Sequence, residues 1–372
     1  MCKSRLSHRR IVIVWFYQGI GMIREQRKLD HIRYALELGD GERKTGFEDI
    51  RFLHNCLTPV EPDRVDIRTR IGNLKLPVPV MIDAITGGAD RVKEINRKLA
   101  EVAGRAGVAL AVGSQYGSVR DGQYADTFAV IREENPDGIF FANVSALATP
   151  EEARAAVDMI RADALEIHLN VTQELIMPEG DKQFSLIRDN LSRLQDCTNV
   201  PIIMKETGCG MAAEQIQELQ AMGFSCFNIA GLGGTSFAAI EAARGRNTRY
   251  EKFASWGIPT AWSLIDAAHV AKPWDTVIAS GGIRNGWQAA LAIALGADAV
   301  AMSGNVLTML MQNGEEAAVA YLQDVIADLK DIMVLTGCRT VRELQRAHMV
   351  YTGETMDFIR SRGYAPLDRR IR

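Results

Sequence analysis

The stretch ALEIHLNVTQE, residues 164–174, has the pattern of a strand that is buried on both faces. Its apolar side chains, Leu165, Ile167 and Leu169, alternate with the polar side chains of Glu166, His168 and Asn170. Successive side chains of a strand point to opposite faces, so one face should be apolar and the other polar. Burying a polar group without a partner costs on the order of a few kcal/mol, so His168 and Asn170 should face a ligand or a polar network. Glu166 lies deeper and is interpreted as an internal hydrogen-bonding group, with no chemistry assigned.

Seven further apolar runs of this kind occur from Pro77 onward. They are VPVMIDAI (78–85), VALAVG (108–113), GIFFANV (138–144), VPIIMKE (200–206), CFNIAG (226–231), TVIASGG (276–282) and DAVAMSG (298–304). Amphipathic stretches separate most of them, and residues 90–107, 149–162 and 212–223 combine helical periodicity with capping residues. Strands that alternate with helices in this number predict a closed (β/α)8 barrel over residues 77–350.

Several regions lie outside this repeat. Residues 22–76 are polar, with a helix expected around 24–38 and an extended ribbon, TRIGNLKLPVPV, leading into the first barrel strand. Residues 232–257 form a connection too long for an ordinary loop, so they should be functional or mobile. Residues 351–372 are expected to be a C-terminal tail. Residues 1–21 carry basic residues and an apolar run too short to span a membrane, and we interpret them as a disordered or mis-assigned extension.

The composition limits the classes of ligand. The formal net charge is −3 at pH 7, so no overall attraction to nucleic acid or an anionic membrane is expected, and an anionic ligand needs a local site. The six cysteines are scattered without a CxxC pair, which indicates a reduced, cytoplasmic protein. Only Cys209 lies near the expected site, and a small buried thiol is its simplest interpretation.

Glycine-rich loops follow the last three predicted strands. GLGGT (231–235), which ends in Thr235, follows the sixth strand, SGGIR (280–284) follows the seventh, and MSG (302–304) ends the eighth. In barrels of this class, backbone N–H groups and a helix N-terminus at this place commonly bind phosphate. One pair of glycines would indicate only a tight turn, but three such loops at one end of a barrel predict a phosphate site.

Polar residues at other strand ends suit a flavin. Lys205 ends the fifth strand and would project a cation into the barrel mouth, where the N1–C2 region of a reduced flavin needs a positive partner. Thr86, Ser114 and Asn143 end the first three strands and could hydrogen-bond the edge of a planar cofactor. Each of these three could equally be a turn or cap residue.

A set of motifs carries a resemblance to a known family. They are RKLDHI (27–32), AITGG (84–88), VGSQ (112–115), HLNVTQE (168–174), KETGCG (205–210), GLGGTS (231–236) and SGGIR (280–284). In this order they resemble the type 2 isopentenyl diphosphate isomerases, FMN enzymes with a (β/α)8 barrel. GGIR occurs in several families of barrel enzymes, whereas the combination of RKxxH, HxNxxQE and GxGGT is specific to the family that this sequence resembles.

The resemblance implies a role for particular residues. The implied FMN contacts are Ala84, Ile85, Thr86, Ser114, Asn143, Lys205 and Thr235, with the FMN phosphate near Gly282, Ile283, Arg284, Ser303 and Gly304. The implied substrate contacts are Arg27, Lys28, Ser114, Gln115, Tyr116, His168, Asn170 and Gln173. Gln173, Glu174 and His168 form the implied catalytic set, and Glu174 is also the implied magnesium ligand. In isolation, Arg27 and Lys28 would indicate a solvated helix face, but the resemblance requires their segment to cover a barrel mouth, its own or a neighbour's.

The activity implied by the resemblance is the interconversion of isopentenyl and dimethylallyl diphosphate. It implies reduced FMN, Mg²⁺, NADPH as the reductant, and a tetramer or octamer. Two positions depart from the family pattern: Ile85 stands where Met is frequent, and Tyr116 where Arg or a small residue is common, with Arg120 nearby to compensate. The alternative is an FMN-dependent α-hydroxy-acid oxidase or dehydrogenase, but that class needs a late His base, and residues 228–245 contain no His.

Overall fold

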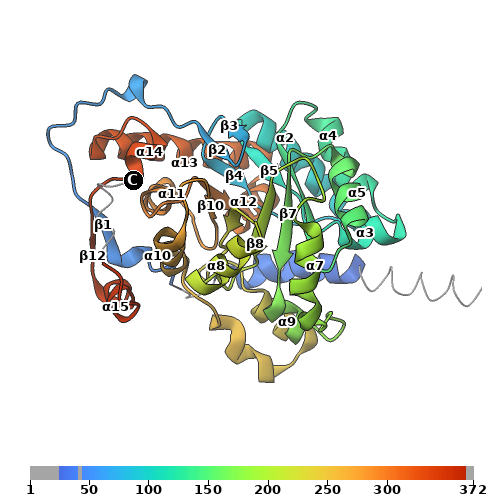
Figure 1. The fold of residues 1–372 in the computed structure, drawn as a ribbon. Helices are drawn as coiled ribbons and strands as arrows, with labels where there is room; N and C mark the ends of the chain where they lie inside the picture. The colour runs from blue at the N-terminus through green and yellow to red at the C-terminus, as the bar shows by residue number, and fades with distance from the viewer. Residues whose placement is uncertain (1–24, 41–43, 366–372) are drawn as a thin grey trace, which may run out of the picture.

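The chain folds into a closed barrel of eight parallel strands (Figure 1). The computed structural model describes residues 25–40 and 44–365, so the expected extension over 1–21 lies outside the described residues. The barrel strands are β4 (Val80–Ile82), β5 (Ala109–Ala111), β6 (Phe140–Ser145), β7 (Ala164–Leu169), β8 (Ile202–Glu206), β9 (Cys226–Asn228), β10 (Thr276–Ala279) and β11 (Ala299–Met302). They close in the order β10–β11–β4–β5–β6–β7–β8–β9. Each of the eight predicted apolar runs supplies one strand, which confirms the (β/α)8 prediction.

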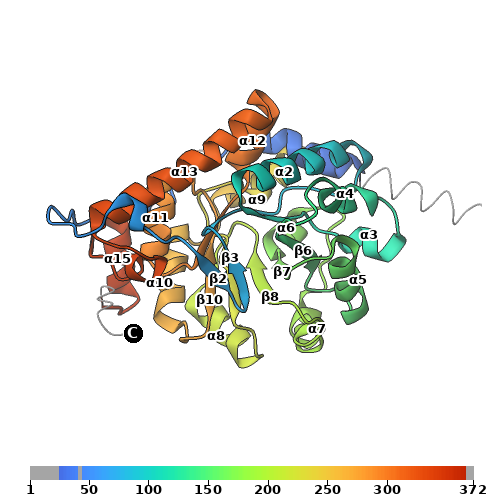
Figure 2. The same ribbon diagram turned by 90° about the horizontal axis from the view of Figure 1, so that it is seen from above.

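Helices surround the strands (Figure 2). They are α2 (Lys93–Ala106), α3 (Tyr116–Asp121), α4 (Asp126–Glu134), α5 (Pro150–Ile160), α6 (Val171–Ile176), α7 (Ile187–Leu194), α8 (Ala213–Ala221), α9 (Phe237–Gly245), α10 (Thr260–Val270), α11 (Gly286–Ala294), α12 (Gly304–Asn313), α13 (Glu315–Thr336), α14 (Val341–Leu344) and α15 (Gly353–Ser361). Short 3-10 turns are η1 (Phe47–Asp49), η2 (Pro62–Arg64), η3 (Asp90–Val92), η4 (Phe184–Leu186) and η5 (Thr248–Ser255). The three helices predicted from periodicity correspond to α2, α5 and α8. Thr149 and Glu152 form a capping box at the start of α5, which satisfies backbone N–H groups that have no partner within the helix.

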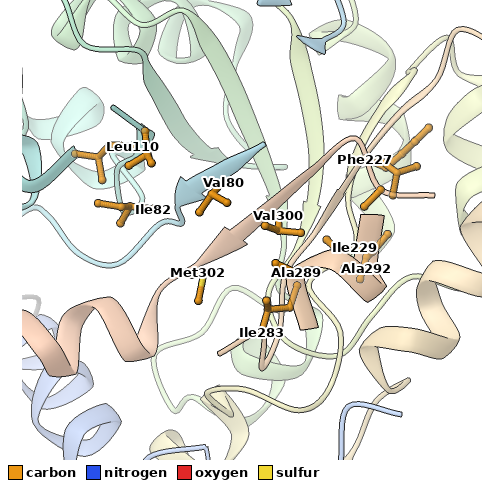
Figure 3. Close-up of a cluster of buried hydrophobic side chains, with 14 of the residues drawn as sticks. Val80, Ile82, Leu110, Phe227, Ile229, Ile283, Ala289, Ala292, Val300 and Met302 are labelled. Atoms are coloured by element: carbon orange, nitrogen blue, oxygen red, sulfur yellow. The ribbon is translucent and has the colours of Figure 1, made fainter. Parts of the chain in front are cut away.

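The two faces of each barrel strand pack into separate layers. Leu165 and Ile167 of β7 are fully buried in the outer layer between strands and helices. Figure 3 shows part of this layer, with Val80 and Val300 from neighbouring strands β4 and β11 among the labelled side chains. Full burial of side chains of this size contributes about 1.5–3 kcal/mol each. Glu166 and His168 are buried on the inner face, which confirms the alternation predicted from the sequence.

An antiparallel hairpin closes the amino-terminal end of the barrel. It consists of β2 (Thr69–Ile71) and β3 (Leu74–Leu76), at the place where the sequence predicted an extended ribbon. Ile71 and Leu76 pack against Met81 and Phe141 inside the barrel. The hairpin lies at the opposite end from α9 (Figure 1). Since apolar side chains fill the amino-terminal end, the carboxyl end is left for a ligand.

The remaining segments cover the barrel. Residues 25–38 are helical, as predicted, and the long connection over 232–257 folds into α9 and η5. Strand β1 (Ile50–Phe52) pairs with β12 (Met349–Tyr351), which joins the N-terminal segment to the chain's other end. The region expected to be a tail contains α15, and its Phe358 stacks on Trp262 of α10 with ring centroids 4.7 Å apart.

Candidate active site

A cavity of about 410 Å³ opens at the carboxyl ends of the barrel strands. Most residues predicted from the sequence line it, and they come from the helix over 25–38, from the carboxyl ends of the barrel strands and from the loops that follow them. These lining residues are Arg27, Lys28, Ala84, Ile85, Thr86, Ser114, Tyr116, Asn143, His168, Asn170, Gln173, Glu174, Lys205, Thr235, Gly282, Ile283, Ser303 and Gly304. The segment with Arg27 and Lys28 therefore covers the mouth of its own barrel.

Two predicted contact residues, Gln115 and Arg284, point away from this cavity. The fully buried Gln115 donates to the backbone oxygen of Ala156 at 2.9 Å and accepts from the backbone N–H of Asn143 at 3.0 Å. Arg284 donates to Asp40 at 2.9 Å and to the carbonyl oxygen of Gly282 at 2.8 Å. Both side chains hydrogen-bond within the walls of the cavity, and their contacts with a ligand stay a prediction.

Glycines at the ends of β9, β10 and β11 form a cradle at one end of the cavity. Gly281 and Gly282 have φ values of 101° and 72°, in the left-handed region that favours glycine. A Cβ atom on Gly281 would lie 2.0 Å from the carbonyl oxygen of Gly231. Helix α12 begins at Gly304, and the Ser303 side chain does not cap it, so its first N–H groups face the cavity end. Such a cradle suits a phosphate.

Gly281→Ala is expected to weaken the cradle severely. The substitution adds left-handed strain of about 1–3 kcal/mol and forces the loops after β9 and β10 apart. The affinity for FMN, the cofactor that the family resemblance implies, should fall at least about tenfold in a fluorescence titration, the equivalent of about 1.4 kcal/mol. Gly107→Ala is the matched control, because its φ of 69° is also left-handed but no atom lies within 4 Å of the added Cβ. Equal FMN affinities in the two variants would contradict the role of the cradle.

A polar network forms the floor of the cavity inside the barrel. Lys205 donates to Asp83 at 2.6 Å, and its Nζ lies 3.8 Å from Glu166. Asn143 donates to Glu166 at 3.0 Å. Burial lowers the pKa of Lys205, but Asp83 and Glu166 outweigh this effect, so the pKa is raised and the side chain is a cation. The floor thus offers a fixed positive charge held by carboxylates.

His168 is a neutral imidazole in this setting. Its Nδ1 lies 2.7 Å from Oδ1 of Asn143, whose amide nitrogen already donates to Glu166. The Nδ1–H group therefore donates to Asn143, and Nε2 is left without a proton. Burial, with Lys28 and Lys205 nearby, lowers the pKa of His168 to about 3. An anion bound beside Lys28 would oppose this effect and favour the imidazolium.

Two carboxylates organise the rim of the cavity. Glu174 accepts from Asn170 at 2.9 Å and from the backbone N–H of Asp181 at 2.7 Å. Glu241, on α9, accepts from Gln173 at 3.1 Å and lies 2.7 Å from Nε2 of His31. Asn170 also donates to Gln173 at 3.5 Å, so Glu174 and Gln173 share this partner, while Asp181 holds only Glu174 and Glu241 only Gln173. Across residues 25–40 and 44–365, no group of three or more His, Cys, Asp or Glu side chains is arranged to hold a metal ion.

Basic residues lie over the rim. The Nε of Arg27 is buried without a hydrogen-bond partner, while its Nη1 donates to Sδ of Met177 at 3.5 Å. Arg120 lies over the Tyr116 ring, with its guanidinium carbon 5.1 Å from the centroid, and both residues line the cavity. The position where Tyr116 replaces a more common Arg is therefore accompanied by a cation four residues later. These groups give the mouth a positive character that suits an anion.

Comparison with known proteins decides the family. A family model described as FMN-dependent dehydrogenase matches residues 142–351. The chain is 43% identical over 344 residues to an isopentenyl-diphosphate delta-isomerase of Geobacillus sp. (strain WCH70), covering 92% of this chain and 98% of that one. The protein of the same name from Bacillus cereus (strain B4264) is 45% identical over 343 residues, covering 92% and 97%. This chain belongs to the isopentenyl-diphosphate delta-isomerase family.

The fold of this isopentenyl-diphosphate delta-isomerase family member is also similar to that of solved mandelate oxidase structures. Mandelate oxidase with (S)-2-phenylpropionate matches with a TM-score of 0.59 at 17% identity, covering 88% of this chain and 97% of that one. At this identity the likeness shows a shared fold and no more. No helix within the described ranges has the length and apolar character needed to cross a membrane.

The cavity of this isopentenyl-diphosphate delta-isomerase family member fits FMN. The glycine cradle suits the phosphate, and Lys205 supplies a buried cation below the cavity. Oγ1 of Thr86 is buried and has no hydrogen-bond partner in the protein, although the residue lines the cavity. A buried hydroxyl of this kind needs a partner, and a flavin edge would provide one. The match to the FMN-dependent dehydrogenase model agrees with this cofactor.

Some residues of the site were not predicted from the sequence of this family member. Asp83 and His31 lie within or beside quoted motifs but received no role, and Glu241 lies in the long connection over 232–257. Glu241 is buried on α9 among Ala238, Ile240 and Ala242. A single acidic residue in a helix whose only other charged residue is Arg244 was the available signal, but the sequence does not show that His31 and Gln173 would meet it.

Glu241→Gln is expected to lower stability in a pH-dependent way. Burial raises the pKa of Glu241, but hydrogen bonds from His31, Gln173 and Arg244 outweigh it and lower the pKa to about 2, from 4.5. A carboxyl group whose pKa is lower in the folded than in the unfolded state stabilises the fold at pH values above its unfolded-state pKa. For Glu241 this contribution is about 3 kcal/mol; it is complete above about pH 4.5 and is lost as the pH falls toward 2.

Urea unfolding at pH 7 and close to pH 2 measures this difference between wild type and Glu241→Gln. The difference should be larger at pH 7. Glu218→Gln is the control, because its pair with Arg188 is solvent-exposed and surface pairs contribute little. A difference that does not change with pH would show that the carboxylate charge is not the source of the stability.

Proposed function

We propose that this chain interconverts isopentenyl and dimethylallyl diphosphate by moving a proton between C2 and C4, with reduced FMN and Mg²⁺. The observation that carries the proposal is the composition of one cavity, which has a phosphate cradle at one end, a buried cation on its floor and a basic rim. Relatives that cover almost the whole chain bear the isomerase name. A cofactor and an anionic substrate can therefore occupy the same barrel mouth.

FMN would be held by residues at several strand ends. Its phosphate would lie against Gly282, Ser303 and Gly304, and its ring above Lys205, beside Thr86 and Asn143. The other proposed contacts are Ala84, Ile85, Ser114, Thr235 and Ile283. When bound in its reduced form, FMN supplies the acid–base group that an apolar alkene cannot find among ordinary side chains.

The substrate diphosphate would be held on the rim. Arg27 and Lys28 reach the cavity from the N-terminal helix, and His168 and Asn170 reach it from the end of β7. Charge-assisted hydrogen bonds from such groups fix both the position and the orientation of a diphosphate. The protein's contribution to rate is then mainly to hold the alkene in a reactive geometry.

Glu174 and Gln173 take different roles in this proposal. Glu174 would bind Mg²⁺, which proteins commonly hold through one or two carboxylates together with substrate phosphates. This agrees with a site that offers no complete metal cage in the described part of the chain. Gln173 would orient the alkene or relay a proton, with its amide fixed by Glu241.

Anaerobic turnover tests the proposed reaction. The purified protein with FMN, Mg²⁺ and NADPH should convert isopentenyl diphosphate to dimethylallyl diphosphate, detected by mass spectrometry or NMR. Omitting the reductant should remove most of the activity. A protein that binds FMN but forms no dimethylallyl diphosphate under these conditions would contradict the proposal.

The mandelate oxidase fold likeness motivates a second candidate, an FMN-dependent α-hydroxy-acid oxidase. That chemistry needs a His base beside the flavin. His168 is a weak base, because its pKa is lowered to about 3, and residues 228–245 carry no His. Lactate and mandelate should therefore leave the flavin absorbance unchanged in an anaerobic mixture, and rapid bleaching would favour the oxidase.

The family resemblance also suggests a tetramer or octamer and NADPH as the reductant. Light scattering on the purified holoenzyme would measure the oligomeric state. Comparing NADH with NADPH as electron donors in the anaerobic assay would identify the preferred reductant.

A further inference from the structure

Glu166 occupies the centre of the polar network below the cavity. It is fully buried, and its two carboxylate oxygens accept from Asn143 at 3.0 Å and from Asn228 at 3.4 Å. Ser280 donates to Asn228 at 2.7 Å, so the second amide is held in turn by β10. A carboxylate with two fixed amide donors inside a barrel is a built site, and the proposed reaction assigns it no role.

The charges around Glu166 do not balance. Lys205 on β8 is the cation within this group, at 2.6 Å from Asp83 and 3.8 Å from Glu166. Lys205, Asp83 and Glu166 together carry a net charge of −1 when both carboxylates are ionised, and they are neutral when Glu166 is protonated. The other ionisable groups facing this floor are His168 on β7, which is neutral, and Glu206, whose carboxylate accepts backbone N–H groups of its own loop.

An added negative charge above Lys205 must therefore act on Glu166. Burial, reinforced by Asp83 and opposed by Lys205, raises the pKa of Glu166 to about 7. Reduction of a flavin to its anionic form places a negative charge in its N1–C2 region, which the proposed function sets over Lys205. Lys205 would then be the cation beside three anions: Asp83, Glu166 and the reduced flavin. This favours protonation of Glu166, the carboxylate that lies farther from Lys205.

We propose that Glu166 takes up a proton when the bound FMN is reduced, so that the summed charge of the barrel floor and the flavin does not change. The flavin accepts two electrons and one proton, at N5, and becomes anionic, while the Glu166 carboxylate accepts a second proton from solvent and becomes a carboxylic acid. The electrons come from a dihydronicotinamide, or from dithionite in the experiment. Glu166 is thus a charge-compensating residue that does not touch the reacting alkene. The inference rests on FMN lying as the proposed function places it.

The pH dependence of the flavin midpoint potential tests this role without any substrate. For a two-electron couple, each proton taken up changes the potential by about 30 mV per pH unit. The wild-type holoenzyme should show about 59 mV per pH unit just above neutral pH, between the pKa of Glu166 in the oxidised protein and its higher pKa in the reduced protein, and about 30 mV per pH unit at still higher pH. Glu166→Gln keeps the shape and should show about 30 mV per pH unit across this range.

Asp83→Asn is the matched variant, because it removes the other carboxylate beside Lys205 and leaves Glu166 in place. Glu166 then loses a repulsive neighbour, so the change of slope should remain but move to lower pH. A Glu166→Gln variant that keeps the wild-type slopes would overturn the inference. So would a wild-type slope of about 30 mV per pH unit throughout the range.

A direct proton count covers the case in which a variant does not fold. Reducing the weakly buffered wild-type holoenzyme with dithionite about one pH unit above neutrality, after correction for the reagent's own protons, should consume about twice the protons of the same experiment at a pH where Glu166 stays ionised in the reduced protein. An equal count at both pH values would reject proton uptake by the protein. Isomerase turnover is measured separately, so an inactive protein with the expected proton count contradicts only the proposed function.

Discussion

Lys205→Met should lower the free energy of unfolding by about 3–5 kcal/mol at pH 7 and abolish FMN binding. The substitution removes a cation that is 5% exposed and leaves Asp83 and Glu166 as buried carboxylates without a counter-charge. Equilibrium denaturation measures the stability, and the flavin absorbance of the purified protein measures FMN retention.

The pH dependence and a double variant sharpen this prediction. Without Lys205, the pKa of Glu166, which burial already raises to about 7, rises further in the folded state, so the destabilisation should grow as the pH rises and shrink in acid. Lys205→Met combined with Asp83→Asn should recover part of the lost stability, because the two residues are coupled at 2.6 Å. Strictly additive effects would show that the ion pair is not what stabilises the floor.

Glu174→Gln should lower kcat/KM by about 10²–10³, the equivalent of about 3–4 kcal/mol, while the protein keeps its FMN. The carboxylate is proposed to bind Mg²⁺, and a neutral amide cannot replace its charge. The concentration of Mg²⁺ needed for half-maximal activity should rise as well. The assay is anaerobic turnover of isopentenyl diphosphate over a series of Mg²⁺ concentrations.

Asp189→Asn provides the control for charge removal, since this residue is exposed on α7 and lies outside the cavity lining. Its activity and Mg²⁺ requirement should equal those of wild type. Loss of FMN from Glu174→Gln, with an unchanged Mg²⁺ requirement in the remaining holoenzyme, would instead assign Glu174 to the cofactor site.

The barrel could be predicted because its signal is local. Leu165 and Ile167 alternate with Glu166 and His168, and this period of two matches the pleat of a strand whatever its neighbours are. The hairpin that ends at Leu76 and the helix that ends before Gly107 carry equally local signals. The unpredicted feature was the folding of residues 232–257 into α9 and η5, because an Ala-rich helix on a barrel's loop end has a weak periodic pattern.

Side-chain direction beyond a strand end could not be predicted in the same way. Ser114 and Gln115 are neighbours in one motif, yet Ser114 lines the cavity while Gln115 packs under α5. Arg284 is expected near a phosphate, and nothing in the sequence indicates that its side chain would also pair with Asp40, a residue 244 positions away along the chain. After a strand ends, the direction of each side chain depends on the geometry of the loop, which cannot be predicted from the spacing of residues in the sequence.

The sequence by itself determined that eight strands would alternate with helices, and that polar groups would gather at the carboxyl ends of those strands. Only the tertiary structure decided which polar groups meet. Closure of the barrel brings Asp83, Glu166 and Lys205 from three different strand regions into one charged group, and it brings His31 and Gln173 to Glu241. Periodicity is a property of neighbouring residues, whereas these contacts depend on the stagger of strands around the closed sheet.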